Sequence, residues 1–207
     1  MSESRLFYIY DPMCSWCYAF ADCWQKLQDK LPGHIQIAYV LGGLAPDTTE
    51  PMPEEMRTMI QQTWRKIERM VPSVHFNYAF WADNTPIRST YPACRAILAA
   101  SRQRSTARTE MLHAIQIAYY RKALNPSLPE TLIQCADEIE LDTIRFAADL
   151  VSAEIDAALK KELNMARTLR AFSFPSLRFL HEEKLYPVNV DYSDENKMLS
   201  EIHVVIA

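Results

Sequence analysis

The chain has no apolar segment long enough to cross a bilayer, no block of basic residues, and only three glycines among 207 residues. The first absence excludes a membrane-spanning helix, which needs about 20 consecutive apolar residues. The formal net charge is −4, and without a lysine or arginine block no surface for nucleic acid is predicted. The composition, 49% hydrophobic and 23% charged, is that of a globular chain with a substantial core.

The cysteines and histidines lack the pairing typical of a structural zinc site. Such a site normally takes four Cys or His ligands, often as two closely spaced pairs. Only Cys14 and Cys17 have that spacing, and no two of the five histidines are separated by three or four residues. No metal site is therefore predicted. We expect Cys23, Cys94 and Cys135 to be small residues packed within helices.

The first residues do not have the pattern of a secretory leader. Met-Ser-Glu-Ser-Arg leads directly into an apolar run, with no apolar h-region followed by a small-residue cleavage site. We therefore expect a cytoplasmic protein. Disulfides in that compartment are usually transient and catalytic, which favours a redox role for a closely spaced pair of cysteines.

Cys14 and Cys17 lie at the predicted start of a helix. The apolar run 6–10 predicts a strand and residues 11–13 a turn, and apolar residues then recur at helical spacing over 15–31. A helix N-terminus stabilises an anion, and the thiolate is the nucleophilic form of cysteine. We therefore expect Cys14 to be a reactive, solvent-accessible thiol.

The spacing of the two cysteines suits disulfide exchange. Residues 14 and 17 lie one helical turn apart on the same face, so a disulfide can join them with little backbone movement. In this interpretation Cys14 attacks a partner disulfide and Cys17 resolves the mixed disulfide. Ser15 and Trp16 lie between the sulfurs and are expected to contact substrate and to influence the redox balance. A chance pair is the alternative that spacing alone leaves open.

The N-terminal part of the chain is predicted to form a strand–helix–strand unit. The predicted strands are 5–10 and 35–41, with the helix 15–31 between them. The second strand ends at Gly42-Gly43, which hold two of the three glycines. They mark either a turn that needs positive φ or a place where the backbone passes close to another group.

The middle of the chain has an almost wholly helical pattern. Prolines and Asp142 mark starts and breaks, and the predicted helices are 53–70, 89–103, 106–122, 129–138, 142–149 and 151–169. Residues 73–87 are predicted as extended or loop structure. Their aromatic group, Phe76, Tyr78, Phe80 and Trp81, is expected to pack the helical layer rather than to contact substrate.

The C-terminal part returns to strand character. Residues 172–180 and 185–190 predict a hairpin with a polar turn, and Pro175 stands at a strand start or in a cis bond within a tight turn. A last helix is predicted from Asp194 with Ser193 as its N-cap. The ending 202–207 has the composition of a strand rather than a helix.

These motifs resemble the DsbA-like branch of the thioredoxin superfamily, and more closely its cytoplasmic FrnE-like subset. The matching residues are Tyr10-Asp11-Pro12-Met13-Cys14-Ser15-Trp16-Cys17-Tyr18, Gly42-Gly43-Leu44 and Phe174-Pro175-Ser176. The resemblance covers essentially the whole chain. It implies an α/β thioredoxin fold, βαβ then ββα, with a large all-helical insertion. The expected thioredoxin-like domain comprises 1–50 and 170–207, and the insertion 51–169.

The resemblance also implies roles for site residues and partners. Pro175 would be a cis-proline facing the two sulfurs, and the backbone at Phe174 and Pro175 would pair with an extended substrate. The implied activity is disulfide oxidoreductase or isomerase, on a dithiol or disulfide protein or a small thiol. No prosthetic cofactor is implied, although glutathione or another thiol could serve as co-substrate. The oligomeric state is not predicted.

Two other functions are compatible with the sequence. A glutathione-dependent transferase or isomerase, of the kappa-class and hydroxychromene carboxylate isomerase type, typically has serine where Cys14 stands, so two cysteines argue against it. A non-catalytic, chaperone-like binding module is the other, with the aromatic group 76–81 and nine methionines as an adaptable apolar surface.

Overall fold

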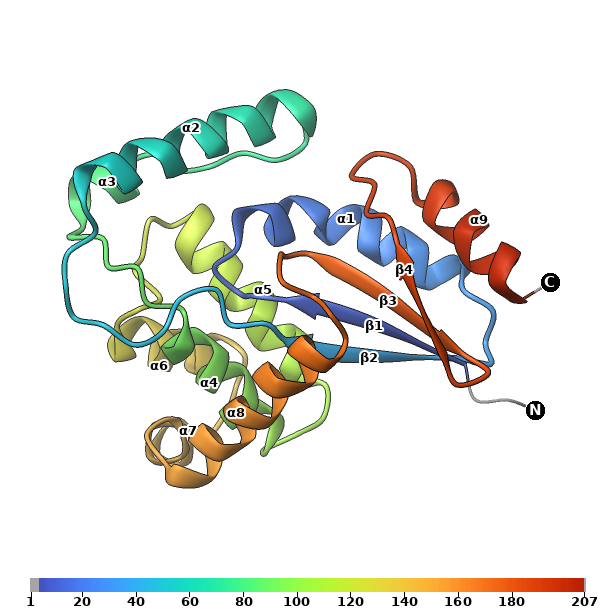
Figure 1. Ribbon diagram of the computed structural model, residues 1–207. Helices are drawn as coiled ribbons and strands as arrows, with labels where there is room; N and C mark the ends of the chain where they lie inside the picture. Colours follow the sequence, from blue (N-terminus) through green and yellow to red (C-terminus); the bar gives the residue numbers. More distant parts are fainter. Residues whose placement is uncertain (1–3, 207) are drawn as a thin grey trace. The chain divides into compact units, whose positions relative to one another are not determined.

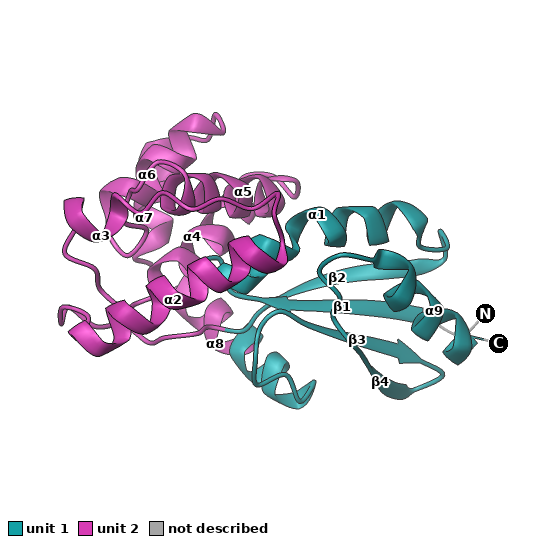
Figure 2. Cartoon of the chain, turned by 90° about the horizontal axis from the view of Figure 1, so that it is seen from above, with its two compact units in different colours: residues 1–42, 162–207 teal, residues 43–161 magenta. Residues whose placement is uncertain are grey.

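The computed structural model describes residues 4–206, which form four strands and nine helices (Figure 1). These residues fall into two compact units (Figure 2), one containing the residues up to Gly42 and from Glu162 onward, the other Gly43–Lys161. The sequence predicted the domain boundaries after residues 50 and 169, whereas the two compact units divide after residues 42 and 161. Helix α8, Ala153–Thr168, runs across the second division, so no loop marks it in the sequence.

The first unit has the mixed sheet of a thioredoxin fold, which confirms the predicted α/β class. Its strands lie in the order β2-β1-β3-β4, with β1 parallel to β2 and the other two pairs antiparallel. The parallel pair requires a crossover, which α1 supplies. The elements are β1 (Ser4–Tyr10), α1 (Ser15–Lys30), β2 (Ile35–Leu41), β3 (Ser176–His181), β4 (Lys184–Val188) and α9 (Glu195–Ile206).

Strand β1 is buried on both faces of the sheet. Tyr8 lies against α1, with its ring 5.8 Å from that of Phe20 and 4.7 Å from that of Trp24. The neighbouring side chains of β1 point to the opposite face. There they join a buried cluster that includes the end of α8 and consists of Phe7, Ile9, Val40, Ala166, Leu169 and Ala171. Burial on both faces explains the continuous apolar run of this strand.

The last helix differs from its predicted form in two ways. Asp194, not Ser193, caps α9, because its carboxylate accepts from the backbone N–H of Asn196 at 3.0 Å. The helix also continues to Ile206, where the sequence favoured a strand; Ala207 lies outside the described residues. Met198 and Ile202, one turn apart, are fully buried as α9 packs beside α1. That packing outweighs the strand preference of the β-branched residues.

The second unit is all helical apart from an isolated bridge between Pro51 and Ile87. Asp142 caps α7 by accepting from two backbone N–H groups, as its place in the sequence predicted. Within the predicted loop 73–87, four residues form the short helix α3, so that part of the prediction was wrong. The helices are α2 (Glu54–Met70), α3 (Phe80–Asp83), α4 (Tyr91–Ser101), α5 (Ala107–Tyr120), α6 (Pro129–Glu138), α7 (Thr143–Leu150) and the first part of α8.

An aromatic cluster around Trp64 holds this second unit together. The Trp64 ring is fully buried and stacks on Phe76 with centroids 4.7 Å apart. The predicted packing role of the aromatic group is therefore confirmed. The remaining rings that contact Trp64 belong to Tyr78, Phe80, Trp81, Tyr119 and Tyr120.

None of the helices within residues 4–206 has both the length and the apolar composition needed to cross a membrane.

Candidate active site

Cys14 is the N-cap residue of α1. Its backbone is extended, with φ −79° and ψ 115°, and its N–H donates to the carbonyl of Asp11 at 3.1 Å to close the turn after β1. Its own carbonyl accepts from Tyr18 at 3.0 Å, which begins the helix. The sulfur thus occupies the place where an N-cap side chain usually supplies an oxygen. Helix N-termini are places where anions bind favourably.

The Phe174 residue of the Phe174-Pro175 segment lies against Cys14. The peptide bond between these two residues is cis, and Pro175 is buried immediately before β3. The Cys14 thiol donates to the Phe174 carbonyl with a sulfur–oxygen distance of 3.4 Å. Residues 160 positions apart in the chain therefore meet at one sulfur.

The Phe174 ring packs over the end of β2 in the same unit. A Cβ atom added to Gly42 would overlap this ring, with the ring's Cδ1 atom only 2.7 Å away. Gly42 therefore allows close approach, whereas Gly43 has a φ of 64°, which L-residues with side chains rarely adopt. Both predicted roles of the glycine pair are confirmed: close approach at Gly42 and positive φ at Gly43.

Cys17 lies one turn further along α1 and is 1% exposed. Burial raises the pKa of its thiol well above the ordinary value, and so do a hydrogen bond with the Cys14 side chain and the Cys14 charge. A hydrogen bond from the Asp11 backbone acts in the opposite direction. Cys17 therefore stays protonated while Cys14 is free, which suits a resolving thiol rather than the first attacker.

Cys14 is less exposed than the sequence led us to expect. Only 6% of its surface is accessible, whereas Ser15 and Trp16, the residues between the sulfurs, are half-buried. Asp11, Pro12 and Met13, in the turn before the motif, are buried as well. Access to this sulfur is therefore narrow.

Three further side chains near the sulfurs were not predicted as site residues. The pKa values of the Tyr8 and Tyr192 hydroxyls are raised, first by burial and then by negative charge at Cys17 and Cys14, so both phenols lie within electrostatic reach of the pair. Asp11 is fully buried, and its carboxylate accepts from the Met13 N–H at 2.8 Å. Strand alternation could have pointed to Tyr8, which faces α1; no local signal marks Tyr192.

The other three cysteines are also buried. The pKa of the Cys23 thiol is raised to about 11 and that of the Cys135 thiol to about 12, mainly because both are buried. Cys94 has no accessible surface. Between residues 4 and 206, no three His, Cys, Asp or Glu side chains are grouped closely enough to hold a metal ion.

These differences predict selective alkylation. We expect iodoacetamide at pH 8 to modify Cys14 alone in the native protein, because only about one Cys23 thiol in a thousand would be ionised three pH units below its pKa. Labelling of Cys23 should become appreciable only as the pH approaches 11. Mass spectrometry of the labelled peptides measures this, and modification of Cys23 or Cys135 at the rate of Cys14 would contradict it.

Residues 7–198 match the sequence profile of the thioredoxin family. The chain belongs to this family. Two curated relatives are ClpXP adapter proteins SpxH, from Halalkalibacterium halodurans and Bacillus subtilis, each 24% identical over 83% and 91% of this chain. The chain spans only 57% and 63% of the length of these two relatives.

Solved structures of DsbA-like proteins share the fold of this thioredoxin-family chain. A Nitrosomonas europaea protein provisionally described as a protein disulfide isomerase superposes with a TM-score of 0.83 at 22% identity, covering 99% of this chain and 98% of that one. The cytosolic disulfide reductase DsbM of Pseudomonas aeruginosa gives 0.77 at 20%, covering 98% and 100%. DsbM with glutathione gives 0.74 at 21%, covering 98% of each chain. At these identities the likeness shows the fold alone.

Proposed function

We propose that this protein is a thiol–disulfide oxidoreductase or isomerase in which Cys14 is the nucleophile and Cys17 the resolving thiol. The observation that carries the proposal is the meeting of Cys14, at the start of α1, with the carbonyl of Phe174 next to cis-Pro175. Cys17 beside it is held as a neutral thiol. The cytosolic reductase with a similar fold supports action in the cytoplasm.

In the first step the Cys14 thiolate attacks one sulfur of a substrate disulfide. A bond forms between Cys14 and that sulfur, the substrate disulfide breaks, and the released sulfur takes a proton from water. The helix N-terminus stabilises the attacking thiolate. An extended substrate would pair with the backbone at Phe174 and Pro175, while Ser15 and Trp16 would border it on the other side.

In the second step Cys17 loses its proton and attacks the Cys14 sulfur. The Cys14–Cys17 disulfide forms, the second substrate thiol leaves, and two electrons have passed to the substrate. Once Cys14 is in a mixed disulfide it carries no charge, so one cause of the raised Cys17 pKa disappears while the Asp11 backbone contact remains. Attack by Cys17 therefore becomes easier only after Cys14 has reacted.

Regeneration requires two equivalents of an external thiol, which reduce the Cys14–Cys17 disulfide and leave as their own disulfide. We propose glutathione for this role, because a protein of the same fold has been solved with it. A cytoplasm rich in reduced glutathione favours net reduction or isomerisation over net oxidation.

Trapping the mixed disulfide tests this function. We expect Cys17→Ser to accumulate a covalent adduct with a disulfide-bonded substrate such as insulin, because the resolving thiol is gone, and dithiothreitol to release it. Intact mass spectrometry measures the adduct. Cys23→Ser is the matched control on the same helix, and it should turn over substrate like the wild type without a lasting adduct. An adduct at Cys23, or none on Cys17→Ser, would contradict the assignment.

A further inference from the structure

We propose that Tyr192 is a positioning residue that holds Trp16, and with it the segment from Cys14 to Cys17, in its reactive form, and that a turn centred on Asp191 holds Tyr192. This inference rests on the proposed function of the cysteine pair. It adds a residue from the far end of the chain to the machinery of that site.

The Tyr192 ring packs on the segment that carries the sulfurs. Its centroid lies 5.1 Å from that of Trp16, with the two rings tilted at 54°. It also meets Phe20, one helical turn beyond Trp16, at 5.9 Å and 77°. Because Trp16 stands between Cys14 and Cys17, a ring that fixes Trp16 also restricts the backbone joining the two sulfurs.

The Tyr192 hydroxyl lies within electrostatic reach of both sulfurs. Its pKa is raised by burial and by the charges of Cys17 and Cys14. Tyr8, from the sheet, is affected by the same two groups. Phenols from two distant parts of the chain, Tyr8 and Tyr192, therefore interact with the charge of the cysteine pair.

A dense set of hydrogen bonds fixes the turn on which Tyr192 stands. One oxygen of Asp191 accepts from the Ser193 N–H at 2.9 Å, the Ser193 hydroxyl at 2.8 Å and the Asp194 N–H at 2.9 Å. The other oxygen pairs with Lys197 at 2.6 Å. These contacts hold the pKa of the Asp191 carboxyl well below its usual range. They immobilise the backbone on both sides of Tyr192.

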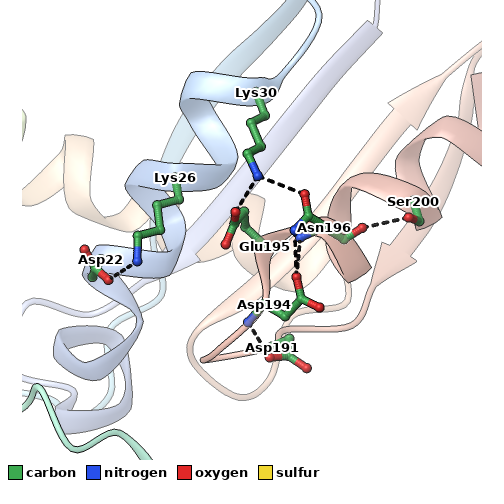
Figure 3. Close-up of polar contacts among 8 residues, drawn as sticks. All are labelled: Asp22, Lys26, Lys30, Asp191, Asp194, Glu195, Asn196 and Ser200. Atoms are coloured by element: carbon green, nitrogen blue, oxygen red, sulfur yellow. Dashed lines mark hydrogen bonds and ion pairs between the residues drawn. The ribbon is translucent and has the colours of Figure 1, made fainter.

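The turn is also tied to α1. Lys30 donates to the Glu195 carboxylate at 2.6 Å and to the Asn196 side-chain oxygen at 2.9 Å (Figure 3). Lys30 is the last residue of α1, whereas Trp16 is near its start. The start of α9 is thus anchored at one end of α1, and Tyr192 contacts the other. This arrangement sets the position of the ring relative to the sulfurs.

Truncation of Tyr192 is expected to change two rates in opposite directions. In Tyr192→Ala the segment from Cys14 to Cys17 is less restricted, so small reagents should reach Cys14 more easily and its reaction with iodoacetamide should become about threefold faster. Trp16 loses its contact with the Tyr192 ring and is held less firmly, so catalysed reduction of a protein disulfide should become about tenfold slower. General damage to the site would not separate the two rates in this way.

Variants of the full chain distinguish the ring from its hydroxyl. Tyr192→Phe keeps the ring and should restore both rates; if it behaves like Tyr192→Ala, the packing role is wrong. Asp191→Ala should reproduce the Tyr192→Ala pattern to a smaller extent, and it serves as the test should Tyr192→Ala fail to fold. Tyr186→Ala, at a half-buried tyrosine on β4, is the matched control and should leave both rates unchanged.

The outcomes separate this inference from the proposed function. If a folded Tyr192→Ala variant shows wild-type rates for both Cys14 alkylation and disulfide reduction, the proposed role of Tyr192 is wrong, even if the protein is an active oxidoreductase. If the wild type does not reduce disulfides, the proposed function fails. The alkylation rate of Cys14 then still reports whether Tyr192 holds the segment, and an unchanged rate in Tyr192→Ala overturns the inference.

Discussion

Replacing Cys14 by serine is expected to lower the catalysed rate of disulfide reduction by on the order of a thousandfold or more. A serine hydroxyl ionises far less readily than a thiol and cannot form the mixed disulfide. Serine preserves the size of a side chain that is only 6% exposed, so the fold should be retained. Turnover of insulin disulfides with glutathione as reductant measures the loss.

The matched control for this experiment is Cys23→Ser. Cys23 is buried on the same helix but has a pKa raised to about 11, so its removal should leave the rate within about twofold of the wild type. Circular dichroism of both variants checks that the helices remain. Substantial activity in Cys14→Ser would exclude Cys14 as the nucleophile and would favour the glutathione-dependent transferase.

Replacing Gly42 by alanine is expected to destabilise the protein by roughly 2 kcal/mol and to reduce disulfide turnover. The new methyl group would overlap the Phe174 ring, which therefore must leave its place against the cluster formed with the end of α8. The Phe174 carbonyl, which accepts from Cys14, belongs to the residue that moves. Urea unfolding measures the stability, and the turnover assay measures the effect on the site.

Gly33 and Phe174 supply the controls. A Cβ atom at Gly33 would meet nothing within 4 Å, so Gly33→Ala should be neutral or slightly stabilising. Phe174→Ala removes the ring that the Gly42 methyl would strike, so the double variant should cost less than the sum of the single changes. Strict additivity would show that the Gly42 and Phe174 side chains do not compete for the same space.

Elements with a strong periodic pattern were predicted well from the sequence. The second strand, Ile35–Leu41, has the predicted bounds, and α1 ends within one residue of its predicted end. The helix α6, Pro129–Glu138, also matches, because its first proline marks a helix start. Such signals are local: the side chains that set the period are those whose burial the structure requires.

Cap and end residues were predicted less reliably. Both Ser193 and Asp194 are good N-cap residues, and the sequence alone favoured the wrong one. In the structure the Ser193 hydroxyl donates to Asp191, which leaves Asp194 to cap α9. That choice depends on a hydrogen-bonded turn whose register a linear pattern does not contain.

A redox role for the two thiols was predicted from their spacing and from their place after a strand, whereas the arrangement of Pro175 was implied only by family resemblance. The side chains that surround the sulfurs were settled by folding. Tyr8 is six residues from Cys14, yet Phe174 and Tyr192 come from beyond the inserted helical unit. Local order along a chain specifies which groups can react, whereas the contacts that bury, orient and exclude water from them arise between segments that only the folded sheet brings together.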